Sequence, residues 1–167
     1  MPNPGKWPVL VDTNAILEAH RCHCWNALAG GLQLETVEMC VAEAFTGHQR
    51  RKNQLLIDSV RLRQSFASIH QVPKLDLAKM SLMEGPALDE GERALWAHAL
   101  QRQDLWVLCG PDAASMRFGY MHGFRDRMLS LEDLLRSVGI RTPAELRRHY
   151  RTAWLRDLFS TLAAQQL

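Results

Sequence analysis

The sequence predicts an α/β fold, a three-layer α/β/α sandwich with a mainly parallel sheet. Short apolar runs at 9–11 and 105–109 are typical of strands that are buried on both faces. These runs alternate with longer stretches whose apolar residues recur at helical spacing. The length of 167 residues, with 47% hydrophobic and 23% charged residues, suits one soluble globular domain over 1–167.

Each element is predicted from its own pattern, with turn and capping residues at its ends. The predicted strands cover 9–11, 34–40, 105–109 and 127–129. The first helix is capped by Thr13 and Asn14 and ended by Gly30-Gly31. Further helices are expected from about 41, over 54–70 and 75–83, from Asp89, after Asp112 and over 131–139.

A helical C-terminal extension is expected from about residue 142. Thr142 and Glu145 form a capping-box pattern with Pro143 between them, at the first helical position. The apolar residues that follow fit one helix face: Leu146, Tyr150, Trp154, Leu158 and Leu162. This face either packs on the chain's own core or serves dimerisation, so a homo-oligomer is one expectation.

No apolar run approaches the roughly 20 residues that a membrane helix requires, and no signal peptide is expected. We therefore expect a cytoplasmic protein with no membrane partner. Its four cysteines are expected to be reduced thiols. The cluster of His20, Cys22, His23 and Cys24 has two interpretations, a zinc site or a helix with buried cysteines, and no second cluster completes four zinc ligands.

Acidic residues follow the strands or open the helices. Asp12 and Asp112 each follow an apolar run, and Glu43, Asp89 and Glu92 stand near helix starts. Ligands of open α/β sheets bind beyond the carboxyl ends of the strands, so we expect these carboxylates to converge there. Such a cluster is tolerable when a divalent cation neutralises it, and all-oxygen ligands favour Mg²⁺ or Mn²⁺. Such ions support phosphodiester hydrolysis.

Each of these acids also has a purely structural interpretation. Asp12 and Asp112 could be helix caps, and Asp89 with Glu92 forms a ready capping box. Glu43 could be a first-turn acid favoured by the helix dipole, with Glu38 as a lesser rival. The net charge of +2 identifies no partner, but Arg50, Arg51 and Lys52 form a basic run that could attract RNA phosphates or be a solvated helix face.

Five segments together resemble the PIN domain family. They are VLVDTNAIL with Asp12 and the following Thr13-Asn14, CVAEAF with Glu43, LDEGERALWAHAL with Glu92 and nearby Asp89, LWVLCGPDAASMRFGY with Asp112, and MLSLEDLLRSVGI. The resemblance covers about residues 8 to 140 in the family's order. It departs at Cys109-Gly110-Pro111, where many relatives carry Ser, Thr or a second acid.

The resemblance implies a PIN fold and a ribonuclease that depends on Mg²⁺ or Mn²⁺. Asp12, Glu43, Glu92 and Asp112 would be its catalytic metal ligands, with Asp89 beside them and Thr13 and Asn14 in support. It further suggests the toxin of a toxin–antitoxin pair, with a small antitoxin protein as partner, and an RNA-processing enzyme fits equally well. The alternative is a catalytically weak PIN scaffold that binds RNA or a protein.

Overall fold

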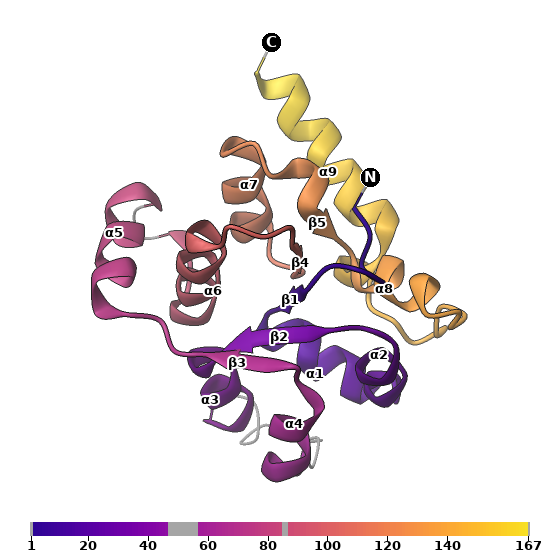
Figure 1. The fold of residues 1–167 in the computed structure, drawn as a ribbon. Coiled ribbons are helices and arrows are strands. Elements are labelled where there is room, and N and C mark those ends of the chain that lie inside the picture. Colours follow the sequence, from indigo (N-terminus) through magenta and orange to yellow (C-terminus); the bar gives the residue numbers. More distant parts are fainter. Residues whose placement is uncertain (1, 47–56, 85–86, 167) are drawn as a thin grey trace.

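Five parallel strands form one sheet in the part of the chain that the computed structural model describes, residues 2–46, 57–84 and 87–166 (Figure 1). They are β1 (Val9–Val11), β2 (Leu34–Val37), β3 (Ser68–His70), β4 (Val107–Cys109) and β5 (Met128–Leu129). Their order in the sheet is β3-β2-β1-β4-β5, with β1 between β2 and β4. The chain therefore starts the sheet at β1 and adds β2 and β3 on one side of it. It then adds β4 and β5 on the other side.

Helices cover both faces of this sheet, which confirms the predicted three-layer α/β/α class (Figure 1). One core joins the sheet to α1 (Thr13–Arg21), α2 (Trp25–Gly31), α4 (Ser59–Ser65) and α8 (Leu131–Ser137). The other core joins it to α5 (Lys74–Glu84), α6 (Glu90–Gln101), α7 (Ala113–Met121) and α9 (Thr152–Gln165). Helix α3 (Glu38–Thr46) contributes side chains to both cores, and the short 3₁₀ helices are η2 (Arg125–Arg127) and η3 (Arg148–Tyr150).

The strands alternate their side chains between the two cores. Val9 and Val11 of β1 are buried in the first core, and Leu10 between them is buried in the second. This alternation follows from the two-residue period of a strand, and it explains why β1 is apolar at every position.

The first predicted helix is two helices. Helix α1 ends at Arg21 and α2 begins at Trp25, so the prediction of one continuous helix was wrong. His23, between them, has a φ of 55°, in the left-handed region that ends a helix. Cys22 and Cys24 are buried in the core on either side of the break, so core packing fixes a turn that the periodicity did not reveal.

The second predicted strand is shorter than expected, because β2 ends at Val37 and α3 begins at Glu38. Part of the helix predicted over 54–70 lies outside the described residues. Of the rest, 59–65 is helical and 68–70 is the edge strand β3, which the sequence did not predict. β3 is defined by its pairing with β2, a long-range contact that overrides local periodicity.

The C-terminal helix begins at Thr152, later than the capping-box pattern at 142–145 predicted. The segment before it bonds to other elements instead: the Arg147 N–H donates to Glu18 (3.0 Å), and Arg21 donates to the carbonyl of Glu145 (2.6 Å). The Thr152 N–H likewise donates to Glu132 (2.8 Å). These tertiary bonds replace the hydrogen bonds that a helix over this segment would form.

Helix α9 packs on the chain's own core. Leu155, Phe159 and Leu162 are buried there, and Trp154 and Leu158 pack against the same cluster. The apolar face of the tail is therefore used within the chain. Among the described residues, no helix is both long enough and apolar enough to cross a membrane.

Candidate metal centre

Two of the predicted acids follow the neighbouring strands β1 and β4. Asp12 comes directly after β1, and Asp112 lies at the start of α7, three positions after the last residue of β4. The two strand ends are aligned, since Val11 pairs with Cys109. The order of the sheet reverses between these strands, and a crevice at such a point is where open α/β sheets bind ligands.

A small polar cleft of about 50 Å³ lies at this edge of the sheet. It is lined by Asp12, Thr13, Asn14, Glu43, Asp89 and Glu92. All six were predicted as site residues from the sequence, and three different helices, α1, α3 and α6, supply them or are capped by them. The cleft has room for an ion or a water molecule, and a nucleotide is too large for it.

Most of these acids lie at helix starts, where their capping interpretation is correct. Glu43 is the exception: it lies in the second half of α3, whose first-turn acid is Glu38, so the prediction that Glu43 stands near a helix start was wrong. Asp12 caps α1 and accepts a hydrogen bond from Ala15 N (2.7 Å). Asp89 and Glu92 form the predicted capping box of α6. Asp112 caps α7 and accepts from the backbone of 114 and 115. Asp112 does not line the cleft, but its charge acts on Asp12 and Glu92.

Glu43 is positioned from two sides. The Thr13 hydroxyl donates to Glu43 Oε2 (2.8 Å), and the Gly91 N–H donates to Glu43 Oε1 (3.0 Å). A Cβ at position 91 would collide with the Glu43 carboxylate in its present place, so glycine allows this close contact. Sequence reasoning did not assign Gly91 a role, although its place next to Glu92 was visible.

Gly110 has a similar effect on Asp12. A Cβ at position 110 would lie 2.9 Å from Asp12 Oδ2, closer than real Cβ contacts allow. The Gly within Cys109-Gly110-Pro111, the point where the sequence departs from the PIN pattern, therefore makes room for the Asp12 carboxylate.

Burial and repulsion between acids raise the pKa values of three carboxylates in the cleft. Burial first, and then the charges of Asp89, Asp112 and Glu43, raise the pKa of Asp12 to about 7. Burial and the charges of Asp112, Asp89 and Asp12 raise the pKa of Glu92 to about 8. The pKa of Glu43 is also raised, by burial and by Asp89, although its hydrogen bond from Thr13 opposes this.

This donor set fits a hard divalent cation. All the side-chain donors are oxygens, and no ion pair among the described residues joins a Lys or Arg to Asp12, Glu43 or Glu92. No three carboxylate oxygens of the cleft lie within 4.8 Å of one another among the described residues. An ion in this arrangement would take one or two carboxylates directly and complete its shell with water, as Mg²⁺ commonly does.

The other sequence candidates lie elsewhere. Glu38, the rival of Glu43, forms an exposed bidentate pair with Arg63 (3.0 Å to each guanidinium nitrogen). Cys22 and Cys24 are buried thiols on either side of the break between α1 and α2. The basic run of Arg50, Arg51 and Lys52 lies outside the described residues.

A second polar cluster, which sequence reasoning missed, lies between β2, β3 and α6. Glu35, His70 and His98 bring three ligand atoms within 4.8 Å of one another. A guanidinium already occupies this cluster, because Arg102 Nη1 lies 2.5 Å from Glu35 Oε2 and 3.1 Å from His98 Nε2. We therefore interpret it as a hydrogen-bonded structural network, hereafter the Arg102 network, in which Arg102 supplies the positive charge.

The sequence matches no model of a known protein family, and a comparison with curated proteins gives no match either. The geometry and chemistry of the cleft therefore carry the functional argument.

Proposed function

We propose that this protein is a divalent-metal-dependent endoribonuclease of the PIN type. The observation that carries the proposal is the convergence of Asp12, Glu43, Asp89 and Glu92 in one cleft at the β1–β4 reversal, with Asp112 close enough to act on it electrostatically. The resemblance of the ordered acidic segments to PIN domains supports the same interpretation.

Asp12, Glu43, Glu92 and Asp112 would hold Mg²⁺ or Mn²⁺, one or two of them directly and the others through water, with Asp89 beside them. The bound ion supplies Lewis acidity for hydrolysis of a phosphodiester. The chain's own part is to fix these carboxylates before the ion arrives, through the helix caps and through the Thr13 and Gly91 bonds to Glu43. Preorganisation of this kind lowers the cost of assembling the site.

The test is cleavage of labelled single-stranded RNA with Mn²⁺ or Mg²⁺, beside an EDTA control and the Asp12→Asn variant. Asn keeps the size of the side chain and its capping oxygen, so the variant should fold while losing a metal ligand. We expect EDTA and Asp12→Asn each to lower the rate by about a thousandfold, which corresponds to about 4 kcal/mol. Cleavage that persists in both would refute the proposal.

A catalytically weak PIN scaffold is the second candidate, and the spacing of the carboxylates favours it. Since no three of their oxygens lie within 4.8 Å among the described residues, metal binding requires adjustment or bridging water. Calorimetric titration with Mn²⁺ separates the two candidates, because a scaffold need not bind Mn²⁺ at the cleft. A toxin role with an antitoxin partner, and a homo-oligomer, stay predictions from the sequence.

A further inference from the structure

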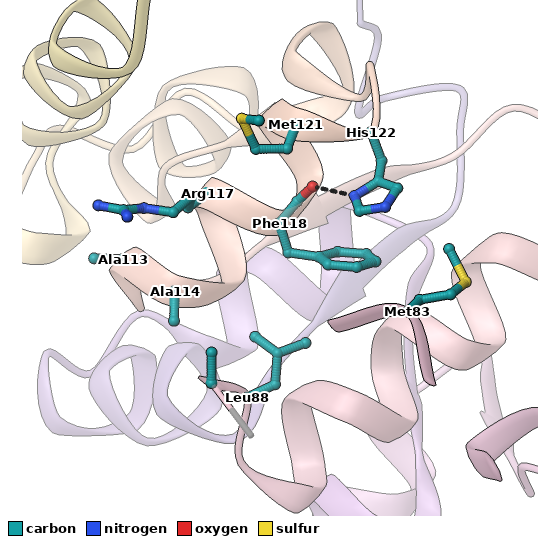
Figure 2. A pocket seen from close by; sticks show the side chains of 9 residues that line it. Met83, Leu88, Ala113, Ala114, Arg117, Phe118, Met121 and His122 are labelled. Carbon is teal, nitrogen blue, oxygen red and sulfur yellow. Dashed lines mark hydrogen bonds between the residues drawn. The ribbon is translucent and has the colours of Figure 1, made fainter. Parts of the chain in front are cut away.

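An apolar groove of about 380 Å³ lies between α7 and the residues that precede α6 (Figure 2). Its lining residues are Met83, Ala87, Leu88, Ala113, Ala114, Arg117, Phe118, Met121 and His122. Its two walls continue into the metal centre, because Leu88 directly precedes Asp89 and Ala113 directly follows Asp112. The volume falls in the range of small-ligand sites.

The groove is apolar and aromatic along α7, with a cation at one end. Phe118 stacks against His122, with ring centroids 4.1 Å apart. Met83 and Met121 are half exposed at its edges. Figure 2 shows Arg117 extending back toward Ala113, the end of α7 that carries Asp112. Among the described residues of the lining, the one guanidinium therefore lies at the end of α7 that carries Asp112, and the apolar surface lies farther along the helix.

We propose that this groove is a nucleobase subsite, in which one base of a single-stranded RNA packs along α7 while Arg117 contacts the phosphate beside it. The inference rests on the proposed function and adds to it a determinant of substrate binding. Bases of single-stranded RNA are recognised by packing on aromatic and apolar side chains, and arginine suits phosphate.

The geometry favours a nucleotide over the helix of a partner protein. A docked amphipathic helix needs a row of apolar anchors over several turns. Here the apolar lining along α7 runs from Ala114 to Met121, which is only about 10 Å, or two turns, of the helix axis. An apolar groove, a guanidinium and an acidic metal site follow one another along this surface. A strand of RNA would place a base, its phosphate and the phosphate bound to the metal in the same order.

The experiment compares an intact RNA with RNAs that carry one abasic nucleotide on either side of the mapped cleavage site. Affinity is measured by fluorescence anisotropy in EDTA, and cleavage is measured separately with Mn²⁺. The wild-type protein should bind one of the abasic RNAs about tenfold more weakly than the intact RNA. Ala114→Leu, which fills the groove, should abolish this difference, and Met121→Ala, at the exposed edge, should reduce it.

Arg117→Gln should weaken binding of the intact and the abasic RNA alike, by about fivefold, because it removes a phosphate contact. The matched controls are Ala153→Leu and Arg156→Gln, at exposed positions of α9. Both variants should bind the intact RNA like the wild type, and both should show the same difference in affinity between intact and abasic RNA.

The subsite is overturned if the wild-type protein binds intact and abasic RNA equally well, or if the difference in affinity is equally large in Ala114→Leu. Either result leaves the proposal of a metal-dependent nuclease unaffected. Unchanged RNA affinity in all the groove variants also overturns it, and would make the groove a protein-docking surface. If the wild-type protein neither binds nor cleaves RNA, the subsite and the proposed function fail together.

Discussion

Two groups of buried carboxylates lie near opposite ends of α6, and they differ in how their charge is balanced. In the cleft, Asp12 is 3% exposed, and the charges that act on it come from other acids. In the Arg102 network, Glu35 is also 3% exposed, but Arg102 and His70 bond to it. Asp12 and Glu35 are therefore equally buried, but Asp12 faces other negative charges and Glu35 faces a positive one.

The pKa values express this difference. Burial raises the pKa of Asp12 to about 7, with the neighbouring acids adding to the effect. Burial also acts to raise the pKa of Glu35, but hydrogen bonds from His70 and Arg102 lower it overall. Burial, together with His70 and Arg102, lowers the pKa of His98 to about 4, so His98 is neutral and can accept from Arg102. The network satisfies its own charges, whereas the cleft leaves a negative charge for a ligand to neutralise.

Removing one carboxylate from each region should change stability in opposite directions, and this is the largest effect we expect. Glu35→Gln leaves Arg102 without its buried partner, so the free energy of unfolding should fall by about 3 kcal/mol. Asp12→Asn relieves the repulsion between carboxylates in the metal-free protein, so it should raise the free energy of unfolding. Urea denaturation in EDTA at about pH 8 measures both.

Activity should show the reverse pattern. Folded Glu35→Gln protein should still cleave RNA, because Glu35 lies outside the cleft, and Asp12→Asn protein should not. A stability loss in both variants would mean that the cleft carboxylates are compensated like the Arg102 network, and the comparison would fail.

The raised pKa values of the cleft should also make the stability of the metal-free protein depend on pH. We expect this effect to be smaller than that of the substitutions. Because the folded-state pKa values of Asp12 and Glu92 are raised to about 7 and 8, the folded metal-free protein binds more protons than the unfolded chain between about pH 4 and pH 8. Its stability should therefore fall as pH rises through this window, by at least about 1 kcal/mol, or about 2–4 °C in Tm.

Differential scanning calorimetry of wild type and Asp12→Asn in EDTA isolates this contribution, since the difference between the two should grow with pH. Mn²⁺ should raise the Tm of the wild type more at about pH 8 than at about pH 6, because metal and proton compete for the same oxygens. Curves that stay parallel across this window would contradict the raised pKa values.

The smallest effect should come from Gly91→Ala, which places a Cβ against the Glu43 carboxylate. We expect a stability loss of only about 0.5 kcal/mol, because the higher helix propensity of Ala offsets part of the clash, and weaker Mn²⁺ binding, since Glu43 must move. Gly30→Ala is the matched control, because a Cβ at Gly30 meets nothing within 4 Å. If both variants bind Mn²⁺ like the wild type, Gly91 does not position Glu43 for the ion.

The sequence by itself determined the fold class and the elements with strong local signals. β1 and the capping box at Asp89 and Glu92 form where predicted, because capping and strand burial depend on residues that are close in the chain. Most acids that surround the cleft were also visible, since Asp12, Asp89 and Glu92 stand at the ends of such elements, whereas Glu43 lies within α3.

Only the tertiary structure decided the remaining features. β3 exists because it pairs with β2, and the break at His23 accompanies the packing of two buried cysteines. The partners of the acids could not be predicted either: nothing local distinguishes Glu35, which meets Arg102, from Glu43, which meets Asp89 and Glu92 in the cleft. Whether a carboxylate is compensated depends on charges brought together from distant parts of the chain, and that arrangement arises only when the chain folds.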